Sequence, residues 1–444
     1  MQWISLAIAA LAATATIAIA AGMEPRTLPH PTEDPFYNVP SNVDSYDNGQ
    51  VIMSRRVSTS IGTMENVASH QVLYRTTNTQ NHASATVATI WTPSKPVSPP
   101  KILSYQLYMD ATQLNCAPSY AFLSGIHNTE KATTILDTPI VISWALKHGF
   151  YVVSPDHEGP RSAFIAGYEE GRAILDGVRA LKNFKELPEN SAVGFYGYSG
   201  GGHATAWAAS LSGGYAPELN IIGAAYGGVP TSTRMIADFL NGKSVFSGFA
   251  LAGISGLARA YPEMEAFILP RLNAEGQKTF ERIGSRGECI AQVAFGYPHL
   301  DFYTLVNDTN MMSEEPIKSI LSVETLLKSE ASYTVPVRKW PRYIWHALED
   351  EIVPFAPASQ YVKEQCAEGA DINWNVLPVQ EHVSAEVTGI APAIAWLSEA
   401  FQGKAPKVPC GAGNLPVAPS VKEVLGDDLV NHLHNLAGQV KAHL

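Results

Sequence analysis

Short apolar runs and helix-like stretches alternate along this chain of 444 residues. The apolar runs are bounded by polar or turn residues, as expected for buried strands. Predicted strands cover residues 101–106, 192–196, 342–348 and 373–379, and predicted helices cover residues 203–209, 358–365 and 391–397. This order of strands and helices is typical of an α/β chain.

A glycine-flanked serine joins the second of these strands to the helix that follows it. Residues 197–201 read Gly-Tyr-Ser-Gly-Gly, and a strand, a G-x-S-x-G turn and a helix form the nucleophile elbow of α/β-hydrolases. Side chains at Gly197 or Gly201 would collide with the adjoining strand and helix. We therefore predict an α/β-hydrolase fold, with a mostly parallel central sheet, helices on both faces and Ser199 as nucleophile.

A nucleophilic serine needs a histidine base and an acid that orients it. In this fold the chain order is Ser, then Asp or Glu, then His, each on a loop after a strand. Asp350 follows the strand 342–348, and His382 follows the strand 373–379. The predicted triad is therefore Ser199, Asp350 and His382. The neighbouring Glu349 and Glu351 remain alternatives for the acid.

The chain has thirteen histidines, and three others deserve comparison with His382. His203 lies four residues after Ser199 on the predicted elbow helix, so we expect it to pack against that helix. His346 lies within or at the end of the strand before Asp350, and His157 ends another strand, where it could line the site. Only His382 has both the chain order and the setting of the base.

The composition is that of a large globular protein, with 46 % hydrophobic and 16 % charged residues. The net charge of −11 without a basic cluster argues against nucleic acid and anionic membranes as partners. Neither a P-loop nor metal-ligand spacing is found, so no cofactor or metal is expected.

The expected organisation has a leader and three parts. Residues 1–21 are alanine-rich and predict a signal peptide cleaved near Ala20, although no Lys or Arg precedes the apolar run. A membrane anchor is the alternative. The hydrolase body would comprise residues 22–231 and 326–444, separated by a helical lid or cap at 232–325.

The apolar stretch 246–257 within the predicted lid has three possible roles: the wall of a substrate tunnel, a helix that seeks a lipid interface, or ordinary buried core.

Four cysteines in a secreted chain suggest two disulfides, for which three connectivities are possible, and free buried thiols are the alternative. The sequence Asn307-Asp308-Thr309 is a glycosylation sequon. It makes Asn307 a candidate glycosylation site.

These motifs together resemble the fungal secretory lipase family over nearly the whole mature chain. The matching stretches are residues 105–110, 154–159, 163–171, 173–181, the elbow at 197–201, residues 350–354, and His382. The resemblance implies the same triad and an oxyanion hole made by Asp110 and the backbone N–H of Gly200. It also implies the disulfides Cys116–Cys289 and Cys366–Cys410, and a flap over the site formed near residues 421–433.

Asp110 follows the strand 101–106, so it lies on a loop at the carboxyl edge of the sheet. Its backbone N–H could serve the oxyanion in any protonation state. Its side chain could donate only when protonated, which requires a desolvated site and a raised pKa. The alternative is that Asp110 only forms a turn.

The resemblance implies a secreted triacylglycerol lipase that acts through an acyl-enzyme on a lipid ester. We also expect a transient lipid-interface contact and a monomer, although the sequence does not reveal the oligomeric state. A second hypothesis is a short-acyl esterase that deacetylates a fungal secondary metabolite such as a trichothecene. A catalytically silent binding protein and a serine peptidase are further alternatives, and the complete triad argues against the former.

Overall fold

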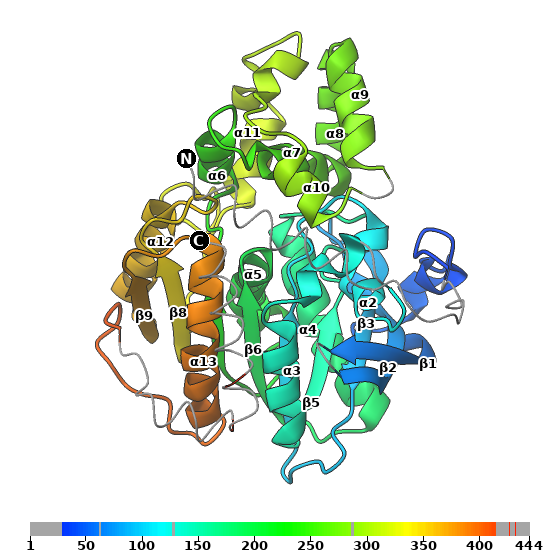
Figure 1. Ribbon diagram of the computed structural model, residues 1–444, viewed down its shortest axis with the longest axis vertical. Coiled ribbons are helices and arrows are strands. Elements are labelled where there is room, and N and C mark those ends of the chain that lie inside the picture. The colour runs from blue at the N-terminus through cyan, green and yellow to red at the C-terminus, as the bar shows by residue number, and fades with distance from the viewer. Residues whose placement is uncertain are drawn as a thin grey trace.

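The computed structural model describes residues 29–61, 64–126, 129–285 and 288–413, together with residues 426 and 431. The strands are β1 (Val51–Ile61), β2 (Met64–Thr77), β3 (Ala83–Trp91), β4 (Lys101–Gln106), β5 (Tyr151–Pro155), β6 (Ala192–Tyr198), β7 (Ile221–Gly227), β8 (Arg342–Ala347) and β9 (Ile372–Leu377). They form a nine-stranded sheet in the order β1-β2-β3-β5-β4-β6-β7-β8-β9 (Figure 1). Pairing is antiparallel from β1 through β3 to β5 and parallel across the rest.

Helices cover both faces of this sheet and also lie above the carboxyl ends of its parallel strands (Figure 1). Their bounds are α2 (Pro118–Ala121), α3 (Thr138–Lys147), α4 (Gly167–Lys185), α5 (Gly200–Tyr215), α6 (Thr233–Leu240), α7 (Ser247–Ala260), α8 (Pro262–Ile268), α9 (Ala274–Ile283), α10 (Ile290–Phe295), α11 (Ile317–Val323), α12 (Phe355–Ala367) and α13 (His382–Ala400). Several short 3-10 turns connect them.

The alternation of side chains along each strand builds two separate cores. Tyr196 of β6 and Trp345 of β8 lie in the core that α3 and α13 cover (Figure 1). Phe195 and Ile344, one position earlier on the same strands, lie in the core under α4, α5 and α12. Both faces of the central strands are therefore apolar, as the continuous apolar runs of the sequence predict.

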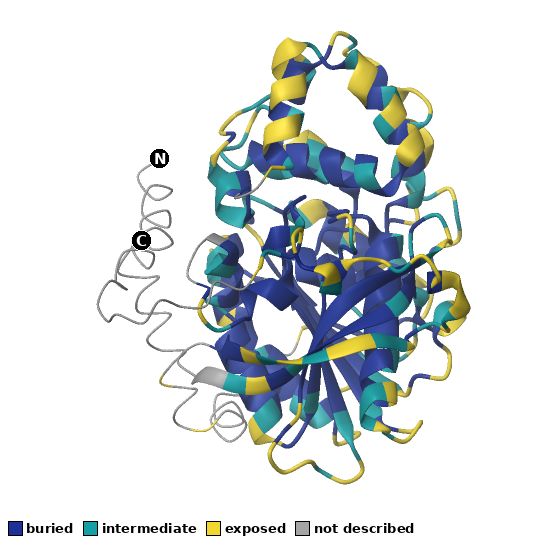
Figure 2. Ribbon diagram, turned by 90° about the vertical axis from the view of Figure 1, so that its right-hand side faces the viewer, coloured by how far each residue is buried: buried dark blue, intermediate teal, exposed yellow. Residues whose placement is uncertain are grey.

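Between β7 and β8 the chain forms α6 to α11, which we call the helical segment (residues 233–323). This segment lies above one edge of the sheet, and its outer helices carry many of the exposed residues (Figures 1 and 2). An antiparallel bridge between Ser232 and Thr325 joins its two ends. Its own apolar core includes Leu251, Ile254 and Met264. The predicted helical character of this region is confirmed.

Two disulfides cross-link the chain, in the pairs that the family resemblance implies. Cys116–Cys289 connects the loop region after β4 to the residue before α10. Cys366–Cys410 connects α12 to the segment that follows α13. Cys116 lies close in sequence to Asp110, and the loop closed by Cys366–Cys410 contains His382.

The predicted strands and helices are present, but the helices are longer than predicted: α5 and α12 extend beyond 203–209 and 358–365 at both ends. Helix α13 begins at His382 rather than at residue 391, because Glu381 and Ser384 form a capping box at its start. The predicted signal peptide lies outside the described residues, as does the stretch 421–433 apart from residues 426 and 431. None of the described helices is both long and apolar enough to cross a membrane.

Candidate active site

Ser199 occupies the sharp turn between β6 and α5, as the elbow motif predicts. Its backbone has φ 52° and ψ −122°, a conformation that residues with a side chain rarely adopt. A Cβ on Gly197 would lie 2.2 Å from the carbonyl oxygen of Gly201. A Cβ on Gly201 would lie 2.0 Å from the carbonyl oxygen of Gln106 on β4. The two glycines therefore allow the close approach of strand and helix that forms the turn.

The carboxyl ends of three parallel strands bring the predicted triad together. Ser199 follows β6, Asp350 follows β8, and His382 follows β9. The Oγ atom of Ser199 lies 2.8 Å from Nε2 of His382. The Nδ1 atom of His382 lies 2.8 Å from Oδ2 of Asp350. Both contacts are hydrogen bonds, so the three side chains are connected in one continuous hydrogen-bonded series.

The orientation of the acid and the base is fixed by backbone contacts. Oδ1 of Asp350 accepts the backbone N–H groups of Val353, at 2.7 Å, and of Ile352, at 3.1 Å. Oε2 of Glu351 accepts the backbone N–H of His382 at 2.9 Å. Asp350 is thus the acid that contacts the imidazole, whereas Glu351 supports the start of α13.

The ion pair shifts both of its members toward their charged forms. Burial alone would lower the pKa of His382, but the carboxylate of Asp350 raises that pKa above its ordinary value. Burial alone would raise the pKa of Asp350, but the charge and hydrogen bond of His382 lower it below its ordinary value. Asp350 therefore remains a carboxylate, ready to stabilise the imidazolium.

The other histidines compared with His382 make their hydrogen bonds with other groups, although Nε2 of His346 also lies 3.5 Å from Oδ2 of Asp350. Nδ1 of His203 lies 2.7 Å from Oε2 of Glu170, and this pair is buried. Nε2 of His346 lies 2.9 Å from the carbonyl oxygen of Val353. Nε2 of His157 likewise contacts a backbone carbonyl, at 3.0 Å. The hydroxyl of Ser199 is paired with His382 instead.

Asp110 and Gly200 lie together beside the serine. Gly200 is the first residue of α5, where a backbone N–H has no partner within the helix. A Cβ on Gly200 would lie 1.9 Å from Oδ1 of Asp110, so this carboxyl stands directly over the glycine. Oδ1 of Asp110 is buried and has no hydrogen-bond partner among the described residues. Burial raises the pKa of Asp110 to about 7, although His382 nearby lowers it.

The backbone N–H of Asp110 already has a partner. It donates a hydrogen bond to Oε1 of Glu158 at 3.1 Å. The sequence offers two donors at Asp110, the backbone N–H and the protonated side chain. Since the N–H is already bonded to Glu158, only the side chain is free to donate to an oxyanion. Glu158 belongs to the motif at residues 154–159, but no spacing in the sequence indicates this contact.

A small pocket of about 100 Å³ adjoins the triad. Its polar side consists of Tyr108, Asp110, Ser199, His382 and Glu386. Its apolar wall comes largely from the helical segment and includes Phe246, Phe249, Ile290, Ala294 and Phe295. An ester whose carbonyl group lies at Ser199 would therefore place an apolar substituent against α7 and α10.

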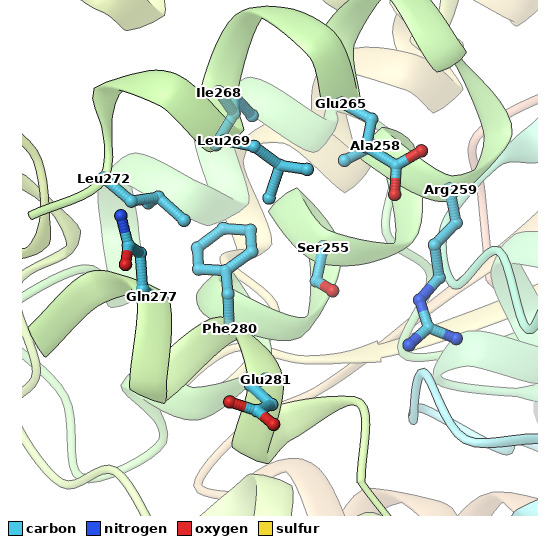
Figure 3. A pocket seen from close by; sticks show the side chains of 10 residues that line it. All are labelled: Ser255, Ala258, Arg259, Glu265, Ile268, Leu269, Leu272, Gln277, Phe280 and Glu281. Atoms are coloured by element: carbon cyan, nitrogen blue, oxygen red, sulfur yellow. The ribbon is translucent and has the colours of Figure 1, made fainter. Parts of the chain in front are cut away.

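A larger hollow of about 420 Å³ lies within the helical segment, lined from α7, α8 and α9 (Figure 3). Ser255 lies on its lining, which has no histidine to serve as a base. The predicted serine and histidine thus line the smaller pocket instead. Within the described residues, no group of three or more His, Cys, Asp or Glu side chains is placed to hold a metal ion.

Comparison with known proteins agrees with this geometry. The sequence model of the family described as secretory lipase matches residues 127–408. Lipase A of Moesziomyces aphidis is 55 % identical over 98 % of this chain and 96 % of its own. A secreted triacylglycerol lipase of Malassezia furfur is 32 % identical over 91 % of this chain and 84 % of its own. The X-ray structure of Candida antarctica lipase A matches with a TM-score of 0.90 and 57 % identity, over 92 % of this chain and 96 % of that one. The predicted α/β-hydrolase fold is thereby confirmed.

Proposed function

Because this chain belongs to the secretory lipase family and is a secreted carboxylic ester hydrolase, we propose that its reaction proceeds through Ser199, His382 and Asp350. The observation that supports this proposal is the pair of 2.8 Å hydrogen bonds that links the three side chains in series. A nucleophile, a base and an orienting acid in this arrangement are what acyl transfer requires.

The reaction has two halves. Nε2 of His382 takes the proton of Ser199 while Oγ attacks the ester carbonyl carbon, and Asp350 stabilises the imidazolium that forms. The backbone N–H of Gly200 and the protonated carboxyl of Asp110 would donate to the developing oxyanion. His382 then gives its proton to the leaving oxygen as the ester C–O bond breaks, so that the alcohol departs and the acyl group remains on Ser199. Water, activated by the same imidazole, hydrolyses the acyl-enzyme and restores Ser199.

We infer that the substrate is a lipid ester and, more specifically, a triacylglycerol. The apolar wall beside Ser199 supports this inference, as does the description of several relatives as triacylglycerol lipases. A specific observation favours the second candidate, a short-acyl esterase: the pocket of about 100 Å³ is much smaller than the sites of about 300–1,000 Å³ that are typical for larger ligands.

An acyl chain-length profile separates the two candidates. We would measure the hydrolysis of esters from acetyl to oleoyl and of emulsified triolein, with Ser199→Ala as the control. Activity that rises toward long acyl chains and is lost in the variant supports the lipase. Activity confined to acetyl esters supports the short-acyl esterase. Ester hydrolysis that persists in Ser199→Ala would refute the proposed nucleophile.

We also propose that residues 232–325 act as a lid or cap over the site. The contribution of α7 and α10 to the pocket wall supports this role. We further propose that the protein makes a transient contact with a lipid interface and that it is a monomer. Asn307, which is exposed, is the proposed glycosylation site. Residues 1–21 would direct secretion, so sequencing of the secreted protein should find its N-terminus close to residue 21.

A further inference from the structure

Asp110 is held in an unusual backbone conformation at the site. Its φ is +50°, in the left-handed region that few residues other than glycine occupy, although aspartate tolerates it better than most. The residue is 4 % exposed, and its carboxyl stands over Gly200. A conformation of this kind persists at a functional site only when surrounding contacts hold it.

The contact that holds the Asp110 backbone comes from Glu158. Asp110 lies on the loop after β4, and Glu158 lies on the loop after the neighbouring parallel strand β5. Oε1 of Glu158 accepts the Asp110 N–H at 3.1 Å, and Glu158 is 1 % exposed. Its other oxygen, Oε2, has no hydrogen-bond partner among the described residues.

The loop that carries Glu158 is itself well anchored. The carbonyl oxygen of Glu158 accepts the backbone N–H of Ala163 at 2.8 Å. Two residues earlier, both carboxyl oxygens of Asp156 accept hydrogen bonds from Ser119, at 2.7 and 2.6 Å. An acceptor on such a loop can fix the position of a neighbouring backbone N–H.

We propose that Glu158 is a positioning residue for the ester hydrolysis: its carboxyl oxygen holds the backbone of Asp110 so that the Asp110 side chain stands over Gly200. This inference rests on the proposed function, because it assigns the Asp110 side chain to the oxyanion. Glu158 acts by accepting one hydrogen bond rather than through its charge. Burial, together with the charges of Glu170 and Asp110, raises the pKa of Glu158 well above its ordinary value, while the hydrogen bond from the Asp110 N–H and the charge of Arg259 oppose that rise.

Three variants of Glu158 test the proposal. Glu158→Gln keeps an oxygen that can accept the Asp110 N–H, Glu158→Asp withdraws the acceptor by one methylene group, and Glu158→Leu removes it. Steady-state kinetics with a soluble ester, p-nitrophenyl butyrate, would give kcat and KM separately.

Loss of one oxyanion donor typically costs about 10²–10³ in kcat, so we expect a fall of about 100-fold for Glu158→Leu. We expect about tenfold for Glu158→Asp and less than about threefold for Glu158→Gln. KM should stay within about twofold, because the pocket wall is unchanged.

Thermal unfolding followed by circular dichroism shows whether each variant is folded, and Glu158→Asp gives the answer if Glu158→Leu is not. Rescue by Gln together with an unchanged KM supports positioning. The proposal is overturned if the folded Leu and Asp variants keep the wild-type kcat, or if Gln loses as much as Leu. Activity of Ser199→Ala would instead refute the proposed function, so the two failures are distinguishable.

Discussion

The pH dependence of this enzyme should depend on the protonation of Asp110. The Asp110 side chain can donate to an oxyanion only when it is neutral, and its pKa is raised from 3.8 to about 7. A carboxyl group is neutral below its pKa, so this donor is present in acid and is lost as the pH rises through 7. Asp110→Asn replaces the carboxyl with an amide, which donates at every pH.

The size of the effect follows from the same pKa. With a pKa of about 7, about 90 % of Asp110 is protonated at pH 6 and about 10 % at pH 8. The wild-type kcat/KM should therefore fall about tenfold over this range because of Asp110 alone. The base acts in the opposite direction: the pKa of His382 is raised, so kcat/KM grows as the pH rises through that value and His382 becomes neutral. The two residues together give a bell-shaped profile.

Acid release from tributyrin, measured in a pH-stat from pH 6 to pH 9, would test this reasoning. Asp110→Asn should lose the alkaline decline and keep the acid limb. Asp110→Ala, which removes the donor altogether, should lower kcat by about 10²–10³ at pH 6. The reasoning is refuted if Asp110→Asn declines above pH 7 as the wild type does, or if Asp110→Ala is nearly as active as the wild type at pH 6.

Three further predictions concern the acid, a disulfide and a strained residue. Asp350→Asn removes the carboxylate that holds the tautomer of His382, so kcat should fall by about 10⁴ with little change in KM; a loss below tenfold would contradict this role. Replacing both Cys366 and Cys410 by serine opens a loop with a sequence separation of 44. Urea unfolding should then show stability lower by about 4 kcal/mol, and no change would contradict the loop-entropy estimate. Val379 is 80 % exposed at φ +57°, so Val379→Asn should stabilise the protein by about 1 kcal/mol in thermal unfolding, because asparagine tolerates this conformation; a lower melting temperature would contradict it.

Much of the fold could be predicted because its signals are local in the sequence. The strand predicted at residues 101–106 coincides with β4, since a short apolar run bounded by turn residues is consistent with a buried strand and is too short for a typical helix. The elbow was predicted because only glycine fits where β6, α5 and β4 approach one another so closely. Chain order then sufficed to find Asp350 and His382, which the structure places within hydrogen-bond distance of one another.

What could not be predicted depends on contacts between distant residues. The hydrogen bond from Asp110 to Glu158 joins two loops 48 positions apart, and neither loop carries a pattern that indicates the other. The pocket wall combines α7 and α10, whose apolar residues look like any buried helix in the sequence. The earlier start of α13 was missed for a different reason, since the Glu381–Ser384 capping box reverses the usual order of its two residue types.

The bridge between Ser232 and Thr325 has a consequence for how this architecture can diversify. The helical segment leaves and re-enters the sheet at adjacent points, between two strands that are hydrogen-bonded neighbours. The register of β7 and β8 therefore does not depend on how many residues lie between them. Evolution or design can lengthen, shorten or exchange the segment, and with it the apolar wall of the pocket, while the serine, histidine and aspartate stay in place on the sheet.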